Sequence, residues 1–116
     1  MGSVPFLFIA ALFFVPNPVT LDVYPPVAMA PATFRFRVIA PRHIDNRVIC
    51  WGYDGPQLKR SCLTLDGQYD RRVWTVYWDL RVGGEYEASA MLTRVEDGRV
   101  KRYSDARYFR VIGLEP

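Results

Sequence analysis

Alternation of hydrophobic and polar residues is the dominant pattern along this chain. It is clearest in residues 32–41, where Phe34, Phe36 and Val38 fall on one side and Arg35 and Arg37 on the other. Successive side chains of a β-strand point to opposite faces, so a period of two predicts a strand with one face in a core. A helical period does not persist for more than a turn or two after the N-terminal segment, which indicates an all-β protein.

Similar stretches recur along the sequence and are bounded by Pro, Gly and Asp, as is typical of β-sandwiches. Together they predict seven strands. Their ranges are 19–26, 32–41, 47–54, a short strand ending at residue 66, 71–80, a strand following the glycines at 83 and 84, and 99–112. This number and the mostly one-sided patterning predict two antiparallel sheets packed face to face.

Large side chains on the inward faces suggest where the core lies. Trp51 on the third predicted strand is expected at its centre. Trp74, Trp78 and Leu80 share one face of the segment 71–80 and should pack against the same core.

Three segments resemble parts of immunoglobulin-like and fibronectin type III domains. "LRVGGEYEASAML" is similar to their tyrosine corner, with Leu80 and Tyr86 at the two defining positions. "RVICWGYDG" resembles the strand that carries the core tryptophan, here Trp51, and "ARYFRVIG" resembles the final strand. The resemblance implies a seven-stranded immunoglobulin/fibronectin-like sandwich over residues 19–113, followed by a tail at 114–116.

More narrowly, the chain resembles small, poorly characterised exported bacterial proteins. The segments "DNRVICW", "SCLTLDG" and "DLRVGGEYEASAML" carry this resemblance, which implies a hydrophobic leader and a scaffold without catalytic chemistry.

An apolar run from Phe6 to Val15 sets residues 1–18 apart from the rest. The run is too short to span a bilayer as a helix, and its length suits the hydrophobic region of a signal peptide, although no Lys or Arg precedes it. Three interpretations stay open: an export signal or short anchor, an apolar strand that packs in this fold or in a neighbouring copy, and an interfacial helix. Candidate contact residues in this segment are Phe6, Phe8, Phe13 and Phe14.

Cys50 and Cys62 flank a turn-rich stretch and are symmetric about Pro56. In an antiparallel hairpin centred there, the two cysteines lie directly opposite each other, within reach of a disulfide. A disulfide would suit an extracytoplasmic protein, periplasmic, at the cell surface or secreted. The alternative is a pair of free thiols in a reducing compartment.

Composition narrows the chemistry further. The 116 residues are enough for one domain, and a net charge of +3 is too small to indicate a nucleic-acid partner. Two cysteines and a single histidine do not make up a zinc ligand set, so we expect neither metal nor cofactor. His43 has Asp45 near it but no serine motif to complete a triad, and aspartates at turns are interpreted as turn formers. The chain is therefore expected not to be an enzyme.

Outward-facing side chains suggest an interaction surface instead. Arg35, Arg37 and Tyr77 are predicted to face solvent, where they would favour an acidic partner. We therefore expect a non-enzymatic extracytoplasmic structural or protein-interaction module, with self-assembly or membrane contact through residues 4–15. The alternative is a carbohydrate- or ligand-binding accessory domain that uses exposed tyrosines.

Overall fold

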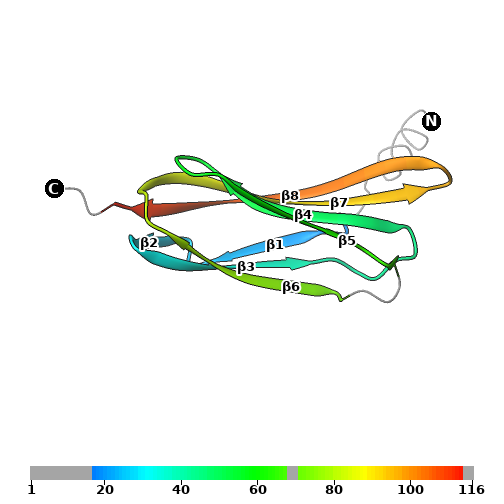
Figure 1. Cartoon of the computed structure of the whole chain (residues 1–116), viewed down its shortest axis with the longest axis horizontal. Coiled ribbons are helices and arrows are strands. Elements are labelled where there is room, and N and C mark those ends of the chain that lie inside the picture. Colours follow the sequence, from blue (N-terminus) through cyan, green and yellow to red (C-terminus); the bar gives the residue numbers. More distant parts are fainter. Residues whose placement is uncertain (1–16, 68–70, 114–116) are drawn as a thin grey trace, which may run out of the picture.

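The computed structural model describes residues 17–67 and 71–113, which form two β-sheets packed face to face (Figure 1). The three-stranded sheet has the order β1 (Thr20–Tyr24), β3 (Ala32–Ile39), β6 (Val73–Leu80). The five-stranded sheet has the order β2 (Val27–Met29), β8 (Arg99–Ile112), β7 (Gly84–Glu96), β4 (Asn46–Asp54), β5 (Lys59–Thr64). The prediction of an all-β protein built from two sheets is confirmed, but the described residues contain eight strands where seven were predicted.

The strand that the pattern missed is β2. It has only three residues, lies between Pro26 and Pro31, and pairs in parallel with β8, with Val27 opposite Arg110. Three residues are too few to show an alternation, and the flanking prolines indicated an end of structure. As a consequence the chain passes from β1 in one sheet directly to β2 in the other, and the five-stranded sheet is not wholly antiparallel.

A cluster of aromatic rings joins the two sheets. The Phe36 ring of β3 lies 5.8 Å from Tyr53 of β4 and 5.5 Å from Phe109 of β8, measured between centroids. Trp78 of β6 packs on Phe36 at 4.9 Å and on Tyr53 at 5.5 Å. Edge-to-face and offset contacts of this kind stabilise a core beyond the area that they bury. The cluster therefore holds β3 and β6 of one sheet against β4 and β8 of the other.

The tryptophans occupy different places relative to this cluster. Trp51 is buried under the five-stranded sheet, but its indole N–H has no hydrogen-bond partner among the described residues. Trp74 and Trp78 are partly buried against the core, and Leu80 is fully buried. The centre of ring packing is thus Tyr53 rather than Trp51, because the neighbouring rings come from β3, β6, β7 and β8 and converge two residues further along β4.

Tyr86 lies just after the turn that connects β6 with β7. Its side chain is almost completely buried and stacks on Phe109, while its hydroxyl donates a hydrogen bond to the Val82 carbonyl at 2.7 Å. The turn requires glycine at position 84, where φ is +144° and an added Cβ would lie 2.5 Å from Cγ of Pro56. The corner therefore ties the crossing between sheets to the hairpin that carries Pro56.

One end of the sandwich is closed by a buried arginine that the sequence pattern did not predict. Arg94 follows Leu92 on the inward face of β7, and its Nε donates a hydrogen bond to Oδ1 of Asn46 at 2.8 Å. Its guanidinium also lies over the Tyr103 ring. Asn46 in turn donates to the Pro41 carbonyl, so both buried polar groups are paired. Within the described residues, no helix is long and apolar enough to cross a membrane.

We expect Tyr86→Phe to lower the free energy of unfolding by about 1–2 kcal/mol, because the Val82 carbonyl loses its donor while the ring packing stays. Urea denaturation of both proteins measures the difference. Tyr108→Phe is the matched control, since Tyr108 is 77% exposed and its loss should stay within about 0.5 kcal/mol. Equal stability of the two variants would contradict a structural role for the corner.

Burial raises the pKa of Tyr53, and burial together with the nearby Tyr53 raises the pKa of Tyr86. The unfolded chain then releases these protons first, near pH 10. The stabilisation is complete below that pH and is lost as the pH rises through the higher pKa of the folded state. We expect the urea midpoint to fall as the pH rises above about 10, and to fall less in Tyr53→Phe. An unchanged midpoint over this range would contradict the assignment.

Candidate functional site

The structure joins Cys50 of β4 and Cys62 of β5 in a disulfide, with their Cα atoms 4.1 Å apart. The two residues are directly opposite in the antiparallel register, as the symmetry about Pro56 predicts. The disulfide thus links two neighbouring strands of one sheet and does not connect the two sheets.

The pleat of β4 places this disulfide on the solvent side. Ile49, Trp51 and Tyr53 point inward and are buried, so the alternate residue Cys50 points outward and is half-buried. Cys62 is exposed on the outermost strand. The two sulfur atoms therefore lie on the outer face of the five-stranded sheet, where small molecules and partner proteins can reach them.

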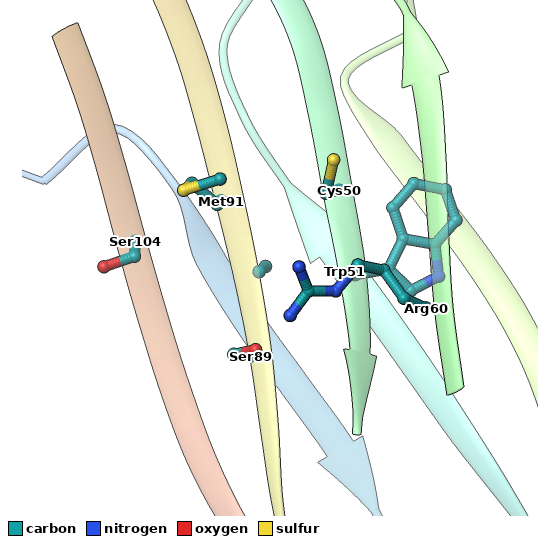
Figure 2. A pocket seen from close by; sticks show the side chains of 7 residues that line it. Cys50, Trp51, Arg60, Ser89, Met91 and Ser104 are labelled. Carbon is teal, nitrogen blue, oxygen red and sulfur yellow. The ribbon is translucent and has the colours of Figure 1, made fainter. Parts of the chain in front are cut away.

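A shallow hollow of about 210 Å³ lies beside Cys50 on this outer face. The short side chains of Ser89 and Ser104 form part of its wall, and Met91 lies between Ser104 and Cys50 (Figure 2). The complete lining is Cys50, Trp51, Arg60, Ser89, Ala90, Met91 and Ser104. The hollow therefore lies next to one cysteine of the disulfide.

Gly52 determines how Arg60 reaches this hollow. A Cβ at position 52 would lie 2.0 Å from the carbonyl oxygen of Lys59 and 2.9 Å from Cα of Arg60, so any side chain would collide with the β5 backbone. Because Gly52 is directly opposite Arg60 and has no side chain, the arginine can lie across β4. Figure 2 shows its guanidinium extending past β4 toward Ser89. Among the described residues, none forms an ion pair or hydrogen bond with this guanidinium.

The predicted interaction residues Arg35, Arg37 and Tyr77 lie elsewhere, on the outer face of the three-stranded sheet. Both arginines contact Oδ2 of Asp22, at 3.1 and 3.4 Å, which partly neutralises them. Tyr77 lies opposite Arg35 and is 66% exposed. The structure does not bring these residues near the disulfide. The predicted contact residues Phe6, Phe8, Phe13 and Phe14 fall outside the described residues.

His43 lies near Asp45 in the part of the chain that the structure describes, and there it does not join a group that could hold a metal ion. Its Nδ1 accepts a hydrogen bond from the Asp45 backbone N–H at 3.0 Å. In residues 17–67 and 71–113, no group of three or more His, Cys, Asp or Glu side chains is arranged to hold a metal ion. Because Cys50 and Cys62 are bonded to each other, the donors that are present do not fit a metal centre in this state.

Comparison with known proteins identifies solved structures that share this fold. No protein-family model matches the chain, and no curated protein matches it. Among solved structures, it is similar to the superoxide reductase (neelaredoxin) from Ignicoccus hospitalis and to a glutamate-to-alanine variant of that protein. Each has a TM-score of 0.56 and 14% sequence identity, and the match covers 82% of this chain and 80% of the other. At this identity the likeness shows the fold.

This comparison corrects the family expected from the sequence. The resemblance to immunoglobulin-like and fibronectin type III domains is wrong, because the solved structures that match are superoxide reductases. The misleading features were Leu80 and Tyr86, which belong to the crossing of the chain between sheets, and Trp51, which fills part of the core. Such packing devices serve any sandwich and do not identify a family.

The same comparison corrects the function that we expected from the sequence. We expected a non-enzymatic structural or interaction module, with a carbohydrate- or ligand-binding accessory domain as the alternative. The fold instead matches that of solved proteins named as reductases, which overturns the expectation that the chain is not an enzyme.

The sequence pattern placed the two cysteines opposite each other, within reach of a disulfide, but did not indicate the hollow or its arginine. The missed residues are Arg60, Ser89, Met91 and Ser104. One signal was present, since the register that places the two cysteines opposite each other also places Gly52 opposite Arg60. The serines and Met91 could not be found in this way, because their position depends on the pairing of β4 with β7 and of β7 with β8.

We expect Gly52→Ala to destabilise the protein by about 1–3 kcal/mol, because the added methyl group displaces the β5 backbone. Thermal and urea unfolding measure the change. Ser89→Ala serves as the control, since it removes an exposed hydroxyl next to Gly52 without adding atoms. A Gly52→Ala protein as stable as the control would show that β5 does not pass so close to β4.

Proposed function

We propose that this chain is a redox protein whose working group is the Cys50–Cys62 pair, which cycles between disulfide and dithiol. The observation that carries the proposal is the position of the disulfide on the solvent-facing side of the sheet beside an open hollow. A disulfide that only staples a fold needs no access to solvent, whereas one that exchanges electrons with external thiols must be reachable by them.

The surrounding structure supports a reversible role. β4 and β5 are already paired from Val48 to Tyr53 by the antiparallel ladder, and the aromatic core lies on the other face of β4. Opening the disulfide therefore breaks no strand pairing and exposes no core residue. The fold can persist with two thiols in place of the disulfide.

The reaction that we assign is a two-electron exchange. A thiolate of an external dithiol attacks one sulfur of the disulfide, the Cys50–Cys62 bond breaks, and the released cysteine takes up a proton. The second thiol of the external dithiol then loses its proton and attacks the external sulfur of the mixed disulfide, which breaks the bond to the protein and releases that cysteine as a thiolate that takes up a proton. The external dithiol leaves as a disulfide and both cysteines of the protein end as thiols.

Two further points support the proposal. The solved proteins that share this fold are named as reductases, so a sandwich of this kind is compatible with redox chemistry. A disulfide as the resting form fits an oxidising compartment, and we therefore propose that the protein works outside the cytoplasm. Its partner would be a thiol-bearing protein or small molecule.

The test treats the native full-length protein with dithiothreitol, blocks the thiols with N-ethylmaleimide and measures the intact mass. We expect two labels to appear while the far-ultraviolet circular dichroism of the sheets is retained. The rate of labelling should not rise in low concentrations of urea. We also expect a reduction potential above about −300 mV, the value below which structural disulfides usually lie. Labelling that follows only on unfolding would mean that the disulfide is a structural cross-link.

The Cys50→Ser/Cys62→Ser double variant is the control. It should take up no label, and it should lose about 2–4 kcal/mol of stability because the unfolded chain is no longer constrained. Circular dichroism should still show a folded sandwich. An unfolded double variant would contradict the claim that the dithiol state keeps the fold.

A further inference from the structure

The hollow beside Cys50 has a size and a charge that restrict what can bind there. Its volume of about 210 Å³ is below the roughly 300–1,000 Å³ of pockets that hold drug-sized ligands. Its one charged lining side chain is Arg60, which has no ion-pair partner among the described residues. Glu87, two residues before Ser89 on β7, pairs with the Tyr108 hydroxyl, whose pKa that interaction raises.

We propose that the hollow binds a small thiol that carries a carboxylate, and that this thiol attacks Cys50 while Cys62 leaves. The inference rests on the redox function proposed above and adds the substrate class and the direction of attack. Arg60 would hold the carboxylate, since a guanidinium and a carboxylate form strong charge-assisted hydrogen bonds. The hydroxyls of Ser89 and Ser104 offer further donors in the same hollow.

The direction of attack follows from the order of strands. Across the outer face, Cys62 of β5, Cys50 of β4, Met91 of β7 and Ser104 of β8 form one row of opposed residues. Thiol–disulfide exchange is a displacement, so the incoming sulfur must approach on the side away from the sulfur that leaves. The hollow lies on the β7 side of Cys50, and Cys62 lies on the β5 side. A thiol held in the hollow is therefore placed to attack Cys50.

The step balances as follows. The thiolate RS⁻ forms a bond to Sγ of Cys50, the Cys50–Cys62 bond breaks, and Cys62 leaves as a thiolate that takes up a proton from solvent. A second RSH gives up its proton and attacks the sulfur of R in the mixed disulfide, which releases RSSR and returns Cys50 as a thiol. Two RSH are oxidised to RSSR and one protein disulfide is reduced to two thiols.

The test compares two probe thiols on the native full-length protein, 3-mercaptopropionate and the neutral 2-mercaptoethanol. For each thiol, the rate of disulfide reduction in a variant is divided by the rate in the parent, so the intrinsic reactivity of the thiol cancels. We expect Arg60→Gln to slow reduction by 3-mercaptopropionate about tenfold more than reduction by 2-mercaptoethanol, as expected for loss of a charge-assisted contact. Arg60→Lys should restore part of the difference.

Arg102→Gln is the matched control, because Arg102 is exposed on β8 and does not line the hollow. It should change both rates by the same factor. An equal effect of Arg60→Gln on the two thiols would overturn the inference while leaving the redox function standing.

Peptide mapping after a rapid quench with N-ethylmaleimide tests the direction of attack. The mercaptopropionate adduct should be on Cys50 and the maleimide label on Cys62, and the reverse assignment would overturn the proposed direction. If neither thiol reduces the native disulfide, the redox function itself fails, an outcome that the rate comparison separates from failure of the substrate class.

Discussion

The pleat of β4 is the constraint on which the rest of this structure depends. Its inward residues include Tyr53, which contacts rings from both sheets, and its outward residues include Cys50 and Gly52. Because side chains alternate strictly along a strand, a slip of one residue would turn Cys50 toward the core and expose Tyr53 to water. The core and the disulfide site are therefore fixed by the same register.

The edge strand β5 supplies further residues of the site beside β4. It is the outermost strand of its sheet, and it can pass close to β4 because Gly52 lacks a side chain. The same approach brings Cys62 opposite Cys50 and allows Arg60 to lie across β4. A single glycine thus links the geometry of the hairpin to the charge of the hollow.

The sequence pattern predicted what depends on neighbours in the chain. Alternation located seven of the eight described strands, and the symmetry of one turn placed Cys50 opposite Cys62. Features that depend on distant partners could not be found in this way. An arginine at an inward position contradicts the hydrophobic pattern until Asn46 and Tyr103 are known to lie beside Arg94.

Two further features lay outside what the pattern could predict. The centre of the aromatic core was misplaced because the rings around Tyr53 come from four other strands. The family was misassigned because a tyrosine corner and a core tryptophan are solutions to packing that different sandwiches share. The hollow beside the disulfide combines side chains of four strands, and only the Gly52–Arg60 pairing within it could be inferred from a single hairpin.

The parallel pairing of β2 with β8 has a consequence for how the protein is made. Val27 pairs with Arg110, and among the described strands β2 has no neighbour except β8, so this early strand takes its partner from the last one. During synthesis that partner does not exist until β8 has left the ribosome. The five-stranded sheet can therefore be completed only after translation of the domain has nearly ended, and β2 must stay unpaired until then, although β1 can already pair with β3.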